Sequence, residues 1–193
     1  ARLRLQDNLS GLQYCVDRLL GRPTAKPSWQ SYSVSADFSL ELVKQLAEDS
    51  RRWGNAQRGI HLYAAHGSGC IACHRIGEVG GRIGPNLTLI ADQRTPESLV
   101  RSLLWPQHEV EAAYQAWQIL TDDGEVIRGY LQQEDDRQVI LADPATRQET
   151  IVNRDNIDSI RSVGSLMPDG LVASFSRQEQ LDLIALVQSL RSN

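Results

Sequence analysis

The sequence of 193 residues has no long apolar run, no basic block and few cysteines. No stretch approaches the ~20 apolar residues that a transmembrane helix needs, so we expect no membrane span in this chain. A net charge of −4 without a Lys/Arg cluster argues against a nucleic-acid partner. Three cysteines are too few for a disulfide scaffold. What remains is the composition of a soluble globular protein, 41% hydrophobic and 23% charged.

A starting Met and the apolar core of a signal peptide are also missing from the beginning of the chain, which reads Ala1-Arg2-Leu3-Arg4. We therefore expect a mature protein or an excised fragment from which any export signal or upstream domain has been removed. The length allows one large domain or two small ones.

Two of the three cysteines form a pair, Cys70-Ile71-Ala72-Cys73, with His74 directly after it. In a c-type haem site each thiol adds to a vinyl group, and a gap of two residues lets both sulfurs reach their vinyls. The histidine that follows is then placed as an axial ligand of the iron. The C-x-x-C-H pattern therefore predicts one covalently attached haem, held by Cys70, Cys73 and His74.

Two other kinds of site also use a C-x-x-C pair. A thioredoxin-like dithiol needs a preceding strand and a βαβ context, whereas the residues before Cys70 have a helical pattern. A zinc site needs four ligands, and the chain has no second cysteine pair. His61 and His66 precede the cysteines and fall on different faces of a helix. We therefore favour haem over both alternatives.

The segment after the motif, 75–87, is rich in glycine and is predicted to be a loop. It ends in Gly84-Pro85-Asn86-Leu87, which resembles a segment that follows the haem motif in class I cytochromes c. There the proline carbonyl accepts the second ring N–H of the axial histidine and orients its imidazole. The resemblance implies this role for Pro85, whereas the residues alone also fit an ordinary Gly-Pro turn.

The chain has a single methionine, Met167, in the sequence Ser-Leu-Met-Pro-Asp-Gly-Leu. A thioether is a common partner of histidine on haem iron, where it raises the reduction potential. Met167 is therefore predicted to be the sixth ligand, and the competing interpretation is a gap-filling core residue. His66 and His108 are the alternative axial ligands, although each also fits a surface or hydrogen-bonding role.

Met167 lies 93 residues after His74, farther than a compact cytochrome c requires, so an insertion is expected between them. Residues 116–163 contain β-branched residues in short alternations and a hairpin turn at Asp122-Asp123-Gly124. This pattern predicts an antiparallel sheet or barrel of four or five strands. Asp122, Asp123, Asp135 and Asp136 follow no calcium-loop pattern and are assigned to water-facing turns.

Helix signals flank the predicted sheet on both sides. Thr95 as N-cap with Pro96 in the first turn predicts a helix that stops at Pro106. Ser176 and Glu179 form a capping box that opens the final helix, which has an apolar stripe. In a cytochrome c core, a final helix packs against the helix before the haem motif.

Three side chains are candidate donors to the haem propionates: Arg82, Arg94 and Trp105. Arg94 follows the Gly-Pro-Asn-Leu segment at nearly the distance at which cytochromes c place such an arginine. The alternative is a solvated surface arginine, because arginine suits carboxylates but is mostly exposed in proteins. Trp105 fits a core position better, as a large and usually buried residue type.

The first fifty residues contain an apolar seam of Leu5, Leu9, Leu12, Val16 and Leu19. We interpret it as an amphipathic helix that packs on the haem domain or remains from an upstream module, because two heptads are few for a coiled coil. The alternative is a helix that forms a homodimer, with Cys15 beside the seam in an interchain disulfide or as a free thiol. A Pro/Ser-rich linker follows, and Asp37 or Ser39 opens a second helix.

From about Trp53 to Leu190 the chain resembles the haem-binding C-terminal domain of large secreted proteins of Planctomycetes and Verrucomicrobia. The ordered motifs that carry the resemblance are Gly59, Tyr63, CIACH, GGRIGPNL, SLLWP, Tyr114, TDDGEVIRGYL, SLMPDGL and QEQLDLIALVQSL. The resemblance implies a mono-haem cytochrome c with a β insertion, ligated by His74 and Met167. It implies no catalytic activity, and it leaves the first 50 residues unassigned.

Together these patterns predict a mainly α fold, with a cytochrome c-like helical haem core, an inserted small antiparallel β sheet or barrel, and N-terminal helices. The predicted parts are helices and linker (1–52), first part of the core (53–115), β subdomain (116–163), and Met loop with final helix (164–193). The predicted function is electron transfer outside the cytoplasm, to a redox partner protein or a fused oxidoreductase module. The alternatives are a gas sensor for CO or NO with a displaceable Met167, and a peroxidase, for which His66 or His108 would have to serve as distal base.

Overall fold

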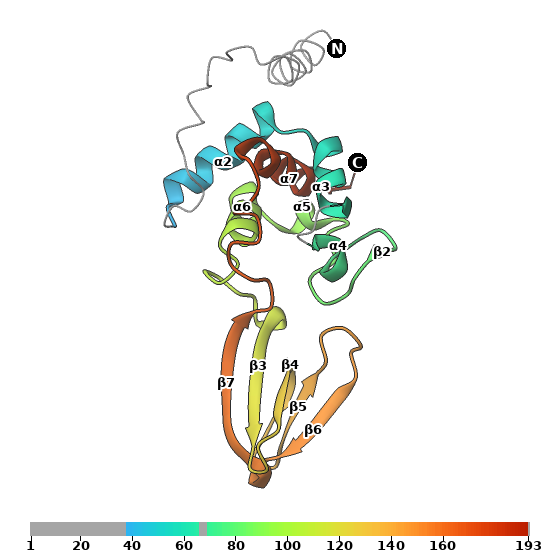
Figure 1. Cartoon of the computed structure of the whole chain (residues 1–193), viewed down its shortest axis with the longest axis vertical. Helices are drawn as coiled ribbons and strands as arrows, with labels where there is room; N and C mark the ends of the chain where they lie inside the picture. The colour runs from blue at the N-terminus through green and yellow to red at the C-terminus, as the bar shows by residue number, and fades with distance from the viewer. Residues whose placement is uncertain (1–37, 66–68, 193) are drawn as a thin grey trace.

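The computed structural model describes residues 38–65 and 69–192. The predictions for the N-terminal seam and Cys15, and for His66 as a ligand, fall outside the described residues. Within them a helical unit and a β sheet lie end to end, with the sheet forming the lower half of the view in Figure 1.

The helical unit is built from four helices of nine residues or more and two single turns. Their bounds are α2 (Leu40–Trp53), α3 (Ala56–Ala65), α4 (Cys70–Cys73), α5 (Ile90–Gln93), α6 (Pro96–Leu104) and α7 (Arg177–Ser189). None of the helices in the described part of the chain is both long and apolar enough to cross a membrane.

Side chains at the N-caps begin three of these helices. The hydroxyl of Ser39 accepts a hydrogen bond from the amide of Leu42 at the start of α2. Thr95 does the same for Ser98 at the start of α6, with Pro96 in the first turn. The capping box of Ser176 and Glu179 opens α7. Because these side chains satisfy amides that lack a partner within the helix, the predicted helix starts are confirmed.

The core of the helical unit lies where α2, α3 and α6 pack on α7. Leu46, Leu181 and Ile184 are fully buried at its centre. The backbones of α3 and α7 approach closely at Gly59, where a Cβ atom would overlap the carbonyl oxygen of Asp182. This close packing needs glycine, because any larger residue would push the two helices apart.

The sheet has five antiparallel strands in the order β6-β5-β4-β3-β7. Their bounds are β3 (Gln115–Thr121), β4 (Val126–Glu134), β5 (Gln138–Ala142), β6 (Glu149–Asn153) and β7 (Ile157–Ser165). The first four strands form a meander, and the single turn η3 (Arg154–Asn156) then brings the chain back so that β7 pairs with β3. The turn η2 (Ala112–Tyr114) precedes β3. A two-stranded hairpin, β1 (Arg75–Ile76) and β2 (Val79–Gly80), lies beside α4.

The sheet has an apolar core separate from that of the helices. Ile119, Val139, Leu141 and Val152 are buried there, with Trp117, Ile127, Leu131, Ile157 and Ile160 packed around them. Gly124 has a left-handed φ of 89° in the β3–β4 connection and donates its amide to the carbonyl of Thr121. The hairpin turn predicted at Asp122-Asp123-Gly124 is therefore confirmed.

The predicted mainly α, cytochrome-like fold class is wrong. Of the described residues 39% are helical and 26% lie in strands, and the five strands make one continuous antiparallel sheet. The sheet buries its own apolar cluster, so it is a second folded unit and not a small addition to a helical core. The chain is an α+β protein.

Candidate cofactor-binding site

The helical turn α4 sets the geometry of the two cysteines. It begins at Gly69, whose φ of 69° suits glycine, and it is closed by a hydrogen bond from the amide of His74 to the carbonyl of Cys70. Cys70 and Cys73 are three positions apart on this turn and therefore lie on one side of it. Both side chains are half-buried. The turn thus presents two thiols together, with an imidazole directly after them.

The ring of His74 is fixed by the proline that follows it in the glycine-rich loop. Nδ1 lies 3.0 Å from the carbonyl oxygen of Pro85. Because a carbonyl can only accept, Nδ1 carries a proton, and in the neutral ring Nε2 is then the nitrogen with the lone pair. Burial lowers the pKa of His74, and the hydrogen bond to Pro85 opposes this in part. His74 is therefore held as the neutral imidazole, the form that binds a metal ion.

The glycine-rich loop packs directly on the motif. Three backbone amides of the loop donate to carbonyls of the motif region: Gly81 to Ile71 at 2.8 Å, Gly84 to Cys73 at 2.8 Å, and Leu87 to Arg75 at 2.9 Å. A Cβ atom on Gly84 would lie 2.5 Å from Cε1 of His74. The loop backbone therefore lies against the imidazole, and only glycine leaves room for this contact.

Tyr63 ties helix α3 to the same segment. Its side chain is 4% exposed, and its hydroxyl donates to the carbonyl of His74 at 2.6 Å. Burial, and secondarily the proximity of Cys70, raises the pKa of Tyr63. The phenol therefore stays protonated and keeps donating across the neutral pH range.

One pocket of about 880 Å³ brings the sequence-predicted residues together. It is lined by Cys70, Cys73, His74, Pro85, Arg94 and Met167, which come from segments more than 90 residues apart. Cofactor pockets have volumes of roughly 300–1,000 Å³. The pocket is thus large enough for an organic cofactor, and its walls carry two thiols, an imidazole and a thioether.

The loop that carries Met167 is held by a residue that no motif had indicated. The side-chain amide of Gln107 donates to the carbonyls of Ser165 at 3.0 Å and of Met167 at 2.9 Å. Its oxygen accepts the amide of Ser165 at 2.9 Å. Gly164 has a φ of 82°, and a Cβ atom there would overlap the Gln107 oxygen. Gln107 and Gly164 together therefore fix the start of the Met167 loop.

The three candidate propionate donors differ in their surroundings. Arg94 lines the pocket and forms an ion pair with Glu111, which lines the pocket as well. Arg82 contributes its carbonyl, which accepts a hydrogen bond from Arg147. Trp105 packs on the helical core, with its ring edge-on to Phe38 at 5.6 Å. Of these three, Arg94 is the donor that lines the pocket, and its guanidinium is already paired with the carboxylate of Glu111.

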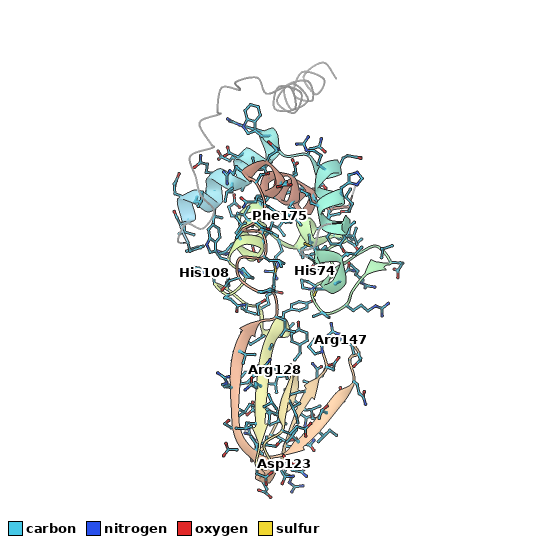
Figure 2. The ribbon with its side chains drawn as sticks, in the orientation of Figure 1. His74, His108, Asp123, Arg128, Arg147 and Phe175 are labelled. Atoms are coloured by element: carbon cyan, nitrogen blue, oxygen red, sulfur yellow. The ribbon has the colours of Figure 1, made fainter. Side chains whose placement is uncertain are left out.

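The remaining described histidines lie away from the pocket. The ring of His108 contacts the ring of Phe38 at a tilt of 45°, with a centroid distance of 3.6 Å, and Figure 2 shows His108 on the other side of the helical unit from His74. His61 is exposed on α3. Among residues 38–65 and 69–192, the histidine that lines the pocket is His74.

The four acids of the hairpin connections are not gathered into a metal site. Across the described ranges no group of three or more His, Cys, Asp and Glu side chains is arranged to hold a metal ion. Asp135 accepts the amides of Arg137 and Gln138, and these hydrogen bonds lower its pKa. Asp123 bonds the hydroxyl of Thr121 in the same way. Both carboxylates shape turns.

Two tyrosines that precede or belong to the sheet complete the pocket wall. Tyr114 and Tyr130 both line it and meet edge to face at a centroid distance of 6.0 Å. Tyr114 belongs to one of the motifs that carry the family resemblance, whereas no predicted role pointed to the phenol of Tyr130. A comparison with protein-family models and with curated proteins found no match to this chain.

Proposed function

We propose that the chain binds one haem covalently through Cys70 and Cys73 and carries electrons with it. The observation that carries the proposal is the shared pocket, in which both thiols, the Pro85-bonded imidazole of His74 and the thioether of Met167 meet. A haem bound there would supply a one-electron ferric/ferrous couple.

The residues present fit such a group in their chemistry. Each thiol can add its S–H across a vinyl C=C bond, with sulfur on one carbon and hydrogen on the other, so that attachment consumes no oxidant. His74 offers a neutral nitrogen with a lone pair, and Pro85 fixes the tautomer and raises the basicity of the ring. Met167 offers a soft sulfur ligand on another segment that lines the pocket.

Electron transfer requires fewer functional groups at this site than catalysis would. Two fixed protein ligands change little between oxidation states, and no general base is required. Gln107 and Pro85 serve this purpose because Gln107 restrains the backbone of Met167 and Pro85 restrains the ring of His74. The partner would be a separate redox protein or a fused oxidoreductase module, and haem attachment of this kind places the chain in an exported compartment such as the periplasm.

Optical spectra of the ferric and the dithionite-reduced protein, each with and without CO, test the proposal. We expect a low-spin ferric spectrum with the weak long-wavelength band of Met ligation and no response of the reduced form to CO. Met167→Ala should abolish that band and make the reduced form bind CO. A native protein that binds CO readily would instead favour gas sensing, and a native protein without haem absorbance would reject the proposal.

A further inference from the structure

The β sheet touches the loop that orients His74 at two successive carbonyl groups. The hydroxyl of Tyr130, on β4, donates to the carbonyl of Ile83 at 2.9 Å. The guanidinium of Arg147, in the β5–β6 connection, donates to the carbonyl of Arg82 at 2.8 Å. Figure 2 shows Arg147 at the end of the sheet nearest His74, with Asp123 at the opposite end. The two acceptor residues, Arg82 and Ile83, immediately precede Gly84 and Pro85 in the chain.

The two donors also brace each other. Tyr130 is 3% exposed, and the Arg147 guanidinium carbon lies over its ring at 5.6 Å from the centroid. Tyr114 meets the same ring edge to face at a centroid distance of 6.0 Å. Burial is the main cause that raises the pKa of Tyr130, so its hydroxyl remains a donor. Contacts of this kind restrict both side chains to one arrangement.

The backbone at Arg147 has an unfavourable conformation, which also indicates that the surrounding structure holds this residue in place. Its φ of 63° is left-handed, and it is the one non-glycine residue with positive φ in the described part of the chain. Such a conformation costs a bulky side chain about 1–2 kcal/mol. It persists where the surroundings enforce it, and here Asp143 holds the turn by accepting the amides of Ala145 and Thr146.

We propose that Tyr130 and Arg147 are positioning residues for His74, and that the sheet thereby forms part of the cofactor site. By holding the carbonyls of Arg82 and Ile83, they fix the loop so that Gly84 stays against the imidazole and the Pro85 carbonyl stays at Nδ1. The consequence for a bound haem rests on the function proposed above. The effect on the hydrogen bond between His74 and Pro85 does not rest on that function, because it involves residues of the chain alone.

The test uses the full chain as isolated and compares Tyr130→Phe and Arg147→Gly with the native protein. NMR gives the solvent exchange rate of the His74 Nδ1–H and of the Gly84 amide, which donates to Cys73. We expect both rates to rise about tenfold in each variant, the effect of losing one hydrogen bond. Arg147→Gly also relieves the left-handed backbone, so increased exchange there cannot be ascribed to strain.

A second readout is the reduction potential of the haem-loaded chain. A weaker Pro85 contact makes the imidazole less basic, so the potential should rise in both variants. Arg128→Ala removes an arginine of β4 that bonds Gln118, and Arg154→Ala removes an arginine that bonds Glu134; neither arginine lines the pocket. Both controls should leave exchange and potential unchanged.

Native exchange rates in both test variants, or equal increases in the two controls, would overturn the inference. A chain isolated without haem would reject the proposed function, while the exchange rates would still decide the positioning role. Circular dichroism identifies a variant that has unfolded. If one variant unfolds, the other, which removes a different donor, decides.

Discussion

At the scale of single residues, the site depends on how closely the loop backbone meets His74. Gly84 has no side chain, and this lets the loop lie against the imidazole while Pro85 bonds Nδ1. A single methyl group at this position would have no free space. The contact of the loop with the His74 ring therefore requires glycine at position 84.

Gly84→Ala should therefore disturb the ring more than the fold. We expect a loss of about 1–3 kcal/mol in the free energy of unfolding, as for other overpacked positions, and a reduced haem content per chain. Urea unfolding and absorbance per chain measure the two quantities. Gly77→Ala is the control for haem content, because a Cβ atom there meets nothing within 4 Å, while its left-handed φ of 61° means that it also loses stability. Native stability and haem content in Gly84→Ala would contradict the assigned contact.

Gln107→Ala tests the restraint on the Met167 loop. The variant loses two donated hydrogen bonds and one accepted bond, all to residues 165–167. We expect the reduced protein to bind CO at least about tenfold more tightly, since Met167 would leave the iron more easily. Gln133→Ala, which removes a bond to Asp135, should behave like the native protein. Equal CO affinity in both variants would show that Gln107 does not restrain the ligand loop.

The sequence could predict residues whose chemistry is encoded by local spacing, and it could not predict those that act across the fold. Cys70, Cys73 and His74 stand together in the chain. Gln107 meets its partners 58 and 60 positions away, and Arg147 meets Arg82 across 65 positions. Long-range contacts of this kind leave no pattern in a single sequence, because any polar side chain can reach a carbonyl.

At the scale of elements, helix starts were predictable because caps are local, whereas helix packing was not. The position of α7 against the α2–α3 junction depends on Asp182, which is 2% exposed. Its carboxylate accepts the amide of Asn55, two donors of Arg58 and the amide of Gln178. One buried charge thus joins α7 to α3 and to the junction before it, and no local pattern in the sequence indicated that Asp182 would be buried.

Asp182→Asn should destabilise the helical unit by about 2 kcal/mol, because hydrogen bonds to a charged acceptor are lost. The loss is not larger because Arg58 is partly exposed, so water can solvate its guanidinium. Thermal or urea unfolding measures the change. Glu134→Gln, in a pair whose two side chains are each about one-third exposed, should cost less than about 1 kcal/mol. Similar losses of unfolding free energy in both variants would mean that the contacts of Asp182 stabilise the fold no more than a partly exposed ion pair does.

The turn that presents Arg147 should contribute to the acid sensitivity of the sheet. Hydrogen bonds from Thr146, and then from Ala145, lower the pKa of Asp143 below its ordinary value of 3.8. A carboxyl with a lowered folded-state pKa stabilises the fold above its ordinary value, and this stabilisation is lost as the pH falls through the folded value. Asp143→Asn should be less stable than the native chain at neutral pH, with the difference vanishing in acid. Unfolding curves across that range measure it, and parallel curves would contradict the assignment.

At the scale of the whole molecule, the chain joins two separate apolar cores at one pocket. The sheet was predictable from its alternation and its Asp-Asp-Gly turn. The share of the chain that lies in strands was not predictable, and the mainly α class was therefore wrong. Alternation shows which residues share a face of a strand, whereas only the assembled structure shows that Tyr130 and Arg147 reach the other unit. The pocket is built by both units.

The most direct test of the central claim is the intact mass of the denatured chain after expression with haem-attachment machinery. The account predicts one haem that stays on the polypeptide in acid and organic solvent, and its loss when Cys70 and Cys73 are both replaced by alanine. A native chain with no added mass, or with haem that dissociates on denaturation, would contradict covalent attachment at this motif.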